Sequence, residues 1–326
     1  MSGSAPMCET LRVQVARKAV EATDICTFEL VQTNGAALPA FSAGSHVDVY
    51  LPGGITRQYS LCNDPTETHR YLIGVLRDPK SRGGSAALHG LVNHGDTLQI
   101  SAPKNHFPLV LNAQRSLLLA GGIGVTPILC MAEYLAIAGR DFEMHYCNRS
   151  HDRAAFVPRI QASSFASRVQ FHFDDGDPGQ KLDMVALLAT PQAGTHLYVC
   201  GPKGFMDAAL SAARAAGWPA SQLHCEFFAA EVEKSDADTR FEVKLASSGR
   251  IIQIAKDKTV IQALVDAGIE VRTACEQGVC GTCLTRVLAG VPDHKDQYLT
   301  PEEQAANNQF TPCCSRSKSA MLVLDL

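Results

Sequence analysis

The sequence predicts a multidomain protein with an antiparallel β-barrel, an α/β domain built on a parallel sheet, and a small C-terminal α+β domain. Three observations support this fold class. Residues 11–101 contain short alternating runs separated by Gly and Pro turns, which is typical of antiparallel barrels. Residues 117–216 alternate apolar strands with helix-like segments, which implies a parallel sheet. Residues 241–326 combine a hairpin pattern, one helix pattern and a cysteine cluster.

Composition narrows the class of protein. The 326 residues are 46% hydrophobic and 19% charged, with a formal net charge of -4, and this length suits two or three domains. No basic excess indicates a nucleic-acid partner, and no apolar run approaches the roughly 18 residues of a membrane span. The first residues lack a secretory signal pattern. We therefore expect a cytoplasmic protein, in which some of the twelve cysteines bind metal rather than form disulfides.

The N-terminal third carries the candidate phosphate site of a flat cofactor. Arg57 and Tyr59 share one face of a strand in Arg57-Gln58-Tyr59-Ser60, so the cation can meet a phosphate while the ring lies against the cofactor. Gly83, Gly84 and Ser85, which follow Arg82, would complete that site if a helix starts there. Taken alone, the motif also fits an ordinary exposed strand. The expected strands are 11–15, 26–30, 47–51, 71–75 and 98–100.

The middle third reads as a nucleotide-binding unit. The apolar run 117–120 leads into the glycine turn 121–127 and then into a helix to about Ala138, an arrangement that presents backbone N–H groups to a pyrophosphate. Strands are expected at 142–146, 169–173 and 196–199, and a helix at 204–216. Ligands bind at the carboxyl ends of parallel strands, where Cys200-Gly201-Pro202 leaves room for a nicotinamide ring. The competing interpretation is a buried core cysteine.

Charged residues after two of these strands bear on the choice between NADH and NADPH, because an acid favours the free ribose hydroxyl and a base favours the 2′-phosphate. Asp174, Asp175 and Asp177 follow one strand, whereas Arg149 and Arg153 follow the other. We favour NADH. These charges also fit a solvated loop.

The C-terminal cysteines have the spacing of a plant-type [2Fe-2S] site. Cys275, Cys280 and Cys283 form C-x4-C-x2-C, and Cys313 or its neighbour Cys314 follows. Zinc sites usually pair two C-x2-C knuckles, and only one is present. Around the cluster, a hairpin at 241–254, a helix at 260–267 that stops at Gly268, a ligand loop at 272–282 and a last strand at 321–326 predict a β-grasp ferredoxin fold.

These patterns divide the chain into four parts. We expect a flavin-binding barrel at 1–110, a nucleotide-binding domain at 111–230, a linker at 231–238 and a ferredoxin domain at 239–326. The linker is expected because Ala229 to Asp238 is charged and lacks apolar periodicity.

The order barrel, nucleotide domain and ferredoxin resembles the phthalate dioxygenase reductase family, which includes vanillate O-demethylase reductases. The resemblance covers nearly the whole chain and implies FMN rather than FAD, since Gly83-Gly84-Ser85 differs from the Gly-x-x-Ser loop of FAD relatives. It also implies that Phe228 covers the flavin and that Cys313 is the fourth ligand, with Cys314 as a spacer. The implied FMN contacts are Arg57, Gln58, Tyr59, Ser60, Gly74, Val75, Leu76, Gly83, Gly84 and Ser85. The implied NADH contacts are Gly121, Gly122, Gly124, Thr126, Pro127, Asp174, Cys200, Gly201, Pro202 and Met206.

The function that follows is that of a reductase component: hydride passes from NADH to FMN, and single electrons pass through the [2Fe-2S] cluster to a protein partner. The family implies a Rieske-type terminal oxygenase acting on an aromatic acid or ether. No side chain is expected as acid or base, because the cofactors carry the redox chemistry, although Ser60 is placed to tune the flavin N5. The alternatives are a reductase for a diiron hydroxylase or another acceptor, and a zinc-stabilised binding module. A monomer is expected.

Overall fold

The computed structural model describes residues 10–79, 83–228 and 238–326. The chain divides into two compact units, Met1–Glu226 and Phe227–Leu326, and each is described by itself. Arg82 and most of the expected linker, 231–237, lie outside the described residues. Among the helices that the structure describes, none combines the length and the apolar character of a membrane span.

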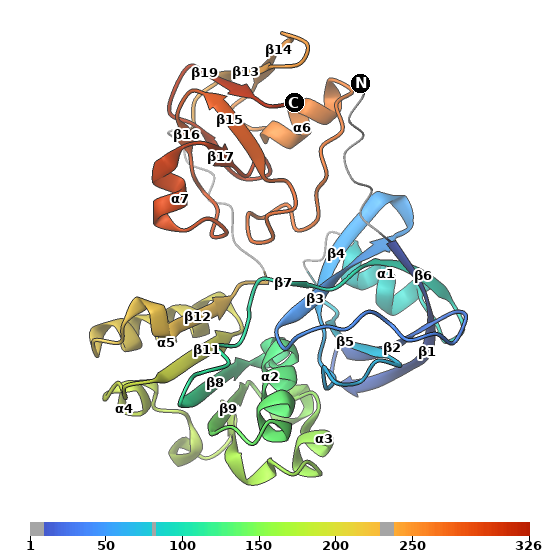
Figure 1. Ribbon diagram of the computed structural model, residues 1–326, viewed down its shortest axis with the longest axis vertical. Helices are drawn as coiled ribbons and strands as arrows, with labels where there is room; N and C mark the ends of the chain where they lie inside the picture. The colour runs from blue at the N-terminus through green and yellow to red at the C-terminus, as the bar shows by residue number, and fades with distance from the viewer. Residues whose placement is uncertain (1–9, 80–82, 229–237) are drawn as a thin grey trace. The chain divides into compact units, whose positions relative to one another are not determined.

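The first part of unit 1 is the predicted antiparallel barrel (Figure 1). Its strands follow the order β4-β3-β6-β1-β2-β5, with β7 beside β3. A bridge between Leu61 and Ile73 brings the end of β4 next to β5 and closes the sheet. Phe28, Leu30 and Ile73 are fully buried in its core. The elements are β1 (Thr10–Ala22), β2 (Ile25–Gln32), β3 (Ser45–Leu51), β4 (Ile55–Ser60), β5 (Tyr71–Leu76), α1 (Gly84–Leu91), β6 (Thr97–Ser101) and β7 (Lys104–Asn105).

The second part of unit 1 is the predicted parallel α/β domain. Its five strands have the order β10-β9-β8-β11-β12, and every adjacent pair is parallel. The last strand, Leu223–Glu226, was not among the sequence predictions. The elements are β8 (Arg115–Gly121), α2 (Val125–Ile137), β9 (Phe142–Asn148), α3 (Val157–Gln161), β10 (Val169–Phe173), α4 (Met184–Leu188), β11 (Thr195–Cys200), α5 (Lys203–Ala215) and β12 (Leu223–Glu226).

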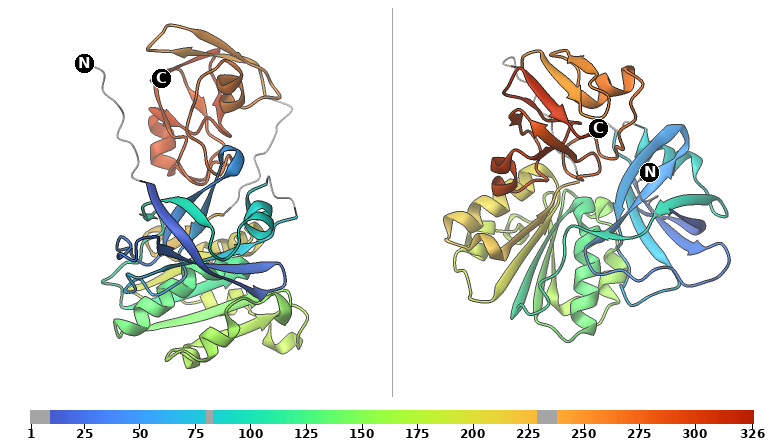
Figure 2. Two further views of the ribbon diagram at one scale, coloured as in Figure 1. Left: turned by 90° about the vertical axis from the view of Figure 1, so that its right-hand side faces the viewer. Right: turned by 45° about the horizontal axis from the view of Figure 1, so that its top comes forward.

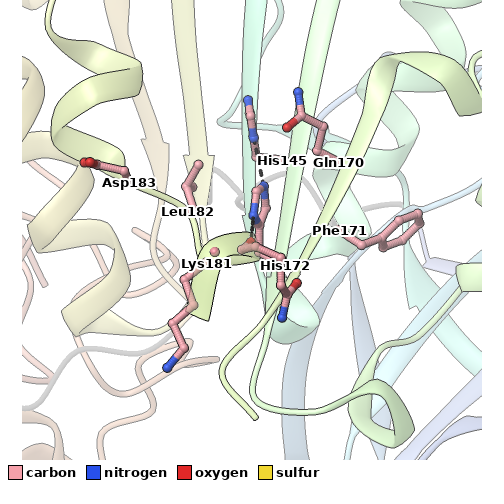
Figure 3. Close-up of a pocket in the computed structure, with 9 residues that line it drawn as sticks. His145, Gln170, Phe171, His172, Lys181, Leu182 and Asp183 are labelled. Atoms are coloured by element: carbon pink, nitrogen blue, oxygen red, sulfur yellow. Dashed lines mark hydrogen bonds between the residues drawn. The ribbon is translucent and has the colours of Figure 1, made fainter. Parts of the chain in front are cut away.

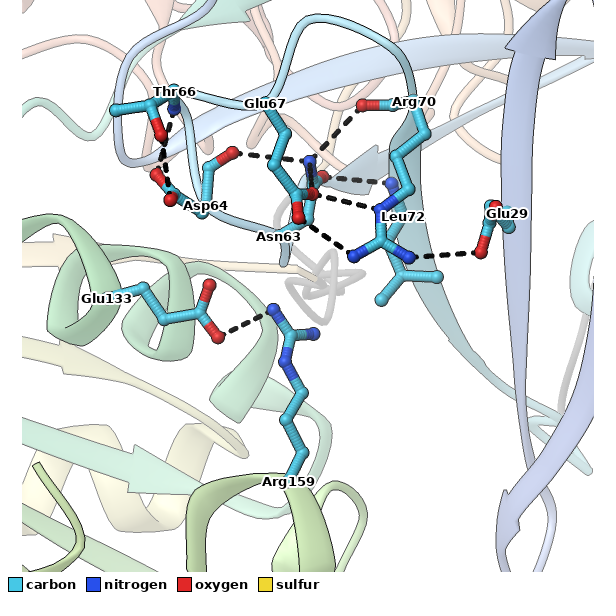
Figure 4. Close-up of polar contacts among 9 residues, drawn as sticks. All are labelled: Glu29, Asn63, Asp64, Thr66, Glu67, Arg70, Leu72, Glu133 and Arg159. Atoms are coloured by element: carbon cyan, nitrogen blue, oxygen red, sulfur yellow. Dashed lines mark hydrogen bonds and ion pairs between the residues drawn. The ribbon is translucent and has the colours of Figure 1, made fainter. Parts of the chain in front are cut away.

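The barrel and the parallel sheet share a core. Ile25 and Cys62 of the barrel are buried in one cluster with Ile128 and Leu129 of α2, and the two parts lie side by side in every view (Figures 1 and 2). Charged residues occupy the same region (Figure 4). Arg159 of α3 pairs with Glu133 of α2 at 2.6 Å, while burial raises the pKa of the Glu133 carboxyl.

Unit 2 has the predicted β-grasp arrangement. Its main sheet follows the order β14-β13-β19-β15-β17, and β16 pairs with β18. The hairpin and the helix ending before Gly268 are confirmed, and Thr259 caps that helix with a capping box. The elements are β13 (Phe241–Leu245), β14 (Ile251–Ile254), α6 (Val260–Asp266), β15 (Thr285–Ala289), β16 (Pro292–Asp293), α7 (Pro301–Ala306), β17 (Gln309–Phe310), β18 (Arg316–Ser317) and β19 (Met321–Leu324).

Candidate functional site

The structure brings Arg57 of β4 onto the first turn of α1. A methyl group built on Gly84 would lie 2.8 Å from Arg57 Nε and 3.0 Å from its Cδ, so residue 84 must be glycine for the arginine to stay where it is. Helix α1 begins at Gly84, after Gly83 in a left-handed conformation. A guanidinium beside a helix N-terminus is a site with the charge and the donors that a phosphate needs. The phosphate site was predicted on the condition that a helix starts at Gly83 to Ser85, and α1 does start there.

The rest of the strand that carries Arg57 divides its side chains between the barrel core and a polar side. Tyr59 packs against the core, and burial raises the pKa of its hydroxyl. The Gln58 amide donates to Asp48 Oδ1 at 2.9 Å, and Asp48 also pairs with Lys104 at 2.6 Å. The side chain of Gln58 is thus held by the barrel, which leaves its backbone as the group for a cofactor contact.

Ser60, at the end of β4, contacts a residue that the sequence analysis missed. Its hydroxyl donates to Glu226 Oε2 at 3.2 Å. Burial raises the pKa of Glu226 to about 8, and the Ser60 hydrogen bond offsets part of that rise. The Glu226 charge in turn contributes to raising the pKa of the buried Cys200 thiol. A carboxyl at the end of a strand next to Cys200 would have indicated a site residue, but the strand Leu223–Glu226 itself was not predicted.

Gly74 of β5 is where the barrel meets the nucleotide domain. A methyl group there would lie 2.9 Å from Thr126 Cγ2 and 3.1 Å from Phe156 Cζ. Its neighbour Val75 is fully buried, and Leu76 is half-buried. The candidate flavin strand therefore contacts the start of α2, which carries the candidate NADH residues.

The glycine turn after β8 packs directly on the turn after β11. A methyl group on Gly124 would collide with the Cys200 carbonyl and lie 2.6 Å from the Gly201 nitrogen. On the facing turn, a methyl group on Gly201 would lie 2.9 Å from Gly121 Cα. The Thr126 hydroxyl donates to the Ile123 carbonyl at 3.0 Å. The two turns approach through backbone at Gly124 and Gly201, and the Pro202 and Phe205 side chains pack on Gly121. Gly122, Pro127, Pro202 and the buried Met206 belong to the same two segments.

The acids and bases that follow β9 and β10 lie at this edge too. Asp174 is exposed, and its N–H donates to the Asn148 carbonyl at 3.0 Å. Arg153 is turned toward the barrel and pairs with Asp24 at 3.5 Å. An acid is therefore available for a ribose hydroxyl, and one of the two candidate bases is engaged elsewhere.

A pocket of about 480 Å³ lies on the other face of the sheet from α2 (Figure 3). His145 Nδ1 and His172 Nε2 are 3.0 Å apart at its wall, and His145 also lies 3.1 Å from Glu143. The Gln180 carbonyl is 2.6 Å from His172 Nδ1. None of the predicted site residues lines this pocket.

The candidate cysteines of unit 2 lie close to one another. Cys275 is within hydrogen-bonding reach of Cys280 and Cys313, and Cys313 is within reach of Cys283 and Cys314. Cys314 contacts Thr311 Oγ1 at 3.2 Å. Among the described residues, no three His, Cys, Asp or Glu side chains are arranged around a position for a single metal ion.

The loop around these cysteines fits a cluster that accepts hydrogen bonds from backbone. The Gln277 N–H points at the Cys275 sulfur at 3.3 Å. Gly278 and Gly281 have φ of +73° and +67°, and a methyl group on Gly281 would collide with the Tyr298 ring. These two positions require glycine for conformation as well as space. The four thiols and the loop therefore fit a [2Fe-2S] cluster.

Phe228 belongs to the second compact unit, where it is 39% exposed. Its expected place over the flavin stays a prediction.

Comparison with known proteins agrees with this geometry. Residues 243–318 match the 2Fe-2S iron-sulfur cluster binding domain, and residues 102–223 match the N-terminal domain of dimethylamine monooxygenase subunit DmmA-like proteins. The chain is 56% identical to vanillate O-demethylase oxidoreductase of Pseudomonas putida over 94% of this chain and 96% of that protein. It is 39% identical to phthalate dioxygenase reductase of Burkholderia cepacia over 97% of each chain.

A solved structure is similar to this chain over nearly its whole length. It is that of a phthalate dioxygenase reductase described as a modular structure for electron transfer from pyridine nucleotides to [2Fe-2S]. The TM-score is 0.76 at 39% identity, with 97% of this chain and 98% of that chain covered.

Proposed function

Because the chain belongs to the phthalate dioxygenase reductase family, we propose that its electron acceptor is a Rieske-type terminal oxygenase acting on a methoxylated aromatic acid. The protein is an NADH-dependent oxidoreductase with FMN and a [2Fe-2S] cluster, and it serves an oxygenase system. The proposal names the acceptor and the substrate class of that system.

The observation that carries the proposal is the identity to vanillate O-demethylase oxidoreductases along nearly the whole chain, at 56% and 54% for two of them. The ferredoxin unit ends the chain rather than starting it, which agrees with reductases of this family. Demethylation of an aryl methyl ether needs two electrons from NADH for each O₂, and it yields a phenol, formaldehyde and water. A reductase that delivers electrons singly meets that need.

The residues of unit 1 have separate tasks in this proposal. Arg57 and the first turn of α1 would hold the FMN phosphate, and Ser60 with Glu226 would contact the ring edge. The turns around Gly124 and Cys200 would hold the nicotinamide ring and exclude water from it. When bound, FMN accepts a hydride from NADH and releases electrons one at a time to the cluster.

In unit 2 the ligands would be Cys275, Cys280, Cys283 and Cys313. Cys313 is preferred to Cys314 because its sulfur lies within reach of Cys275 and Cys283. The Cys314 sulfur also lies near Cys313 and Gly278, but its hydrogen bond is to Thr311. The protein would act as a monomer in the cytoplasm, where NADH is available and the thiols remain reduced.

Reconstitution tests the acceptor. The purified chain is mixed with NADH, vanillate and a purified Rieske-type O-demethylase, and formaldehyde is measured against NADH consumed. We expect one formaldehyde per NADH. A protein that bleaches with NADH but supports only a diiron hydroxylase would overturn the choice of acceptor and leave the reductase activity intact.

A further inference from the structure

Helix α1 is held at its C-terminal end by a lysine from a distant strand. Lys18 of β1 donates from Nζ to the carbonyls of His89 and Val92, each at 2.7 Å. Val92 is the residue that ends the helix. The last carbonyls of a helix lack helical partners and carry its negative end, so this ammonium both satisfies them and opposes the dipole.

A second contact fixes the same end to the strand expected to run beside the flavin. His89 Nε2 lies 2.9 Å from the Val75 carbonyl of β5. Lys18 also lies 5.5 Å from the centre of the Phe28 ring, and Phe28 pairs with Ile73 across β2 and β5. Two side chains thus fix this end of the helix: Lys18 of the barrel wall and His89 of α1 itself.

The opposite end of α1 is the phosphate site beneath Arg57. Eight residues make about two turns, roughly 12 Å in length, and so short a helix is marginal without tertiary contacts. A direct attraction between Lys18 and a phosphate at the far end would act over more than the Debye length of about 10 Å in 0.1 M salt. Any effect of Lys18 on the phosphate must therefore act through the helix.

We infer that Lys18 is a positioning residue for FMN, with His89 as its partner: together they hold α1 so that its first turn and Arg57 form the phosphate site. This inference rests on the FMN site placed under Proposed function. Neither residue touches the cofactor. Lys18 acts on the phosphate end of FMN through α1, and His89 joins α1 to the Val75 carbonyl of β5.

Comparing FMN with riboflavin separates positioning from general stability, because riboflavin lacks the phosphate. The full chain is stripped of flavin, and each flavin is titrated back while quenching of its fluorescence is measured. Lys18→Met should weaken the binding of FMN roughly tenfold, which corresponds to a loss of about 1.4 kcal/mol, and should leave the binding of riboflavin unchanged. Lys18→Arg should restore most of the FMN affinity. Arg17→Met, at the exposed neighbour, should change neither.

Arg57→Met tests the phosphate site separately from the positioning role of Lys18. It should weaken FMN binding and leave riboflavin binding unchanged. Suppose that Arg57→Met weakens only FMN binding, while Lys18→Met changes the binding of both flavins equally or of neither. The positioning role of Lys18 is then overturned, and the phosphate site is retained. If Arg57→Met does not weaken FMN binding selectively, the phosphate site and the positioning role are both overturned. If Lys18→Met does not fold, His89→Ala is titrated in its place. It should weaken the binding of FMN and not that of riboflavin. An equal effect on the binding of both flavins would overturn the inference.

Discussion

Replacing Glu226 by Gln should stabilise unit 1 at neutral pH and leave it unchanged in acid. Glu226 is half-buried beside Ser60, Cys200 and Cys225. Of the described groups that shift its pKa, none is a cation. Folding raises its pKa from the ordinary 4.5 to about 8. Below pH 4.5 the carboxyl is protonated in both states, so the native protein bears no penalty. As pH rises from 4.5 to 8, only the unfolded state ionises and stability is lost.

The magnitude follows from the pKa values. Each pH unit between 4.5 and 8 is worth at most about 1.4 kcal/mol. Because solvent screens the half-buried carboxyl, about 3 kcal/mol at pH 7 is the upper limit of the loss. Gln keeps the shape of the neutral acid and can still accept from Ser60. For a unit of 226 residues, 3 kcal/mol corresponds to roughly 6–12 °C in Tm.

The assay is thermal unfolding of the flavin-free chain, followed by the fluorescence of Trp218, which is the one tryptophan of the sequence and lies buried in unit 1. It is measured for wild type and Glu226→Gln from pH 5 to pH 8. The two Tm curves should nearly meet at pH 5 and diverge steadily above it, with the variant higher. Asp175→Asn, at an exposed carboxylate, should parallel the wild type. Parallel curves for Glu226→Gln would refute the reasoning, since they would mean that Glu226 titrates alike in both states.

Other outcomes follow from the site. Ser60→Ala should slow anaerobic flavin reduction by NADH about tenfold while FMN loading stays normal; an unchanged stopped-flow rate would count against a role at the flavin ring. Gly281→Ala should lower cluster content in the visible spectrum, because Ala at φ of +67° costs about 1–2 kcal/mol and meets the Tyr298 ring. Cys313→Ser should abolish the [2Fe-2S] absorbance and Cys314→Ser should retain it; the reverse pattern would make Cys314 the ligand.

The sequence predicted those parts of the fold that depend on local periodicity. The strands around Phe28 and Phe171 alternate clearly, and the helix that ends before Gly268 has both a cap and a stop signal. The strand Leu223–Glu226 was missed because its four residues are polar or half-buried and it forms only by pairing with Val199 and its neighbours. The cluster loop could be predicted from cysteine spacing because three of the four proposed ligands, Cys275, Cys280 and Cys283, lie within nine residues.

Contacts between residues far apart in the chain could not be predicted from the sequence, for a different reason. Glu226 gains its raised pKa only where folding places it against Ser60, and Lys18 becomes a helix cap only where β1 passes the end of α1. Neither residue stands in a motif, because its partner is supplied by the packing of the barrel. Motifs such as Arg57 to Ser60 contain the groups proposed to touch a cofactor, whereas the residues that set their position and charge are found through three-dimensional contacts. Mutagenesis confined to the motifs would therefore identify the ligand contacts and overlook what holds them in place.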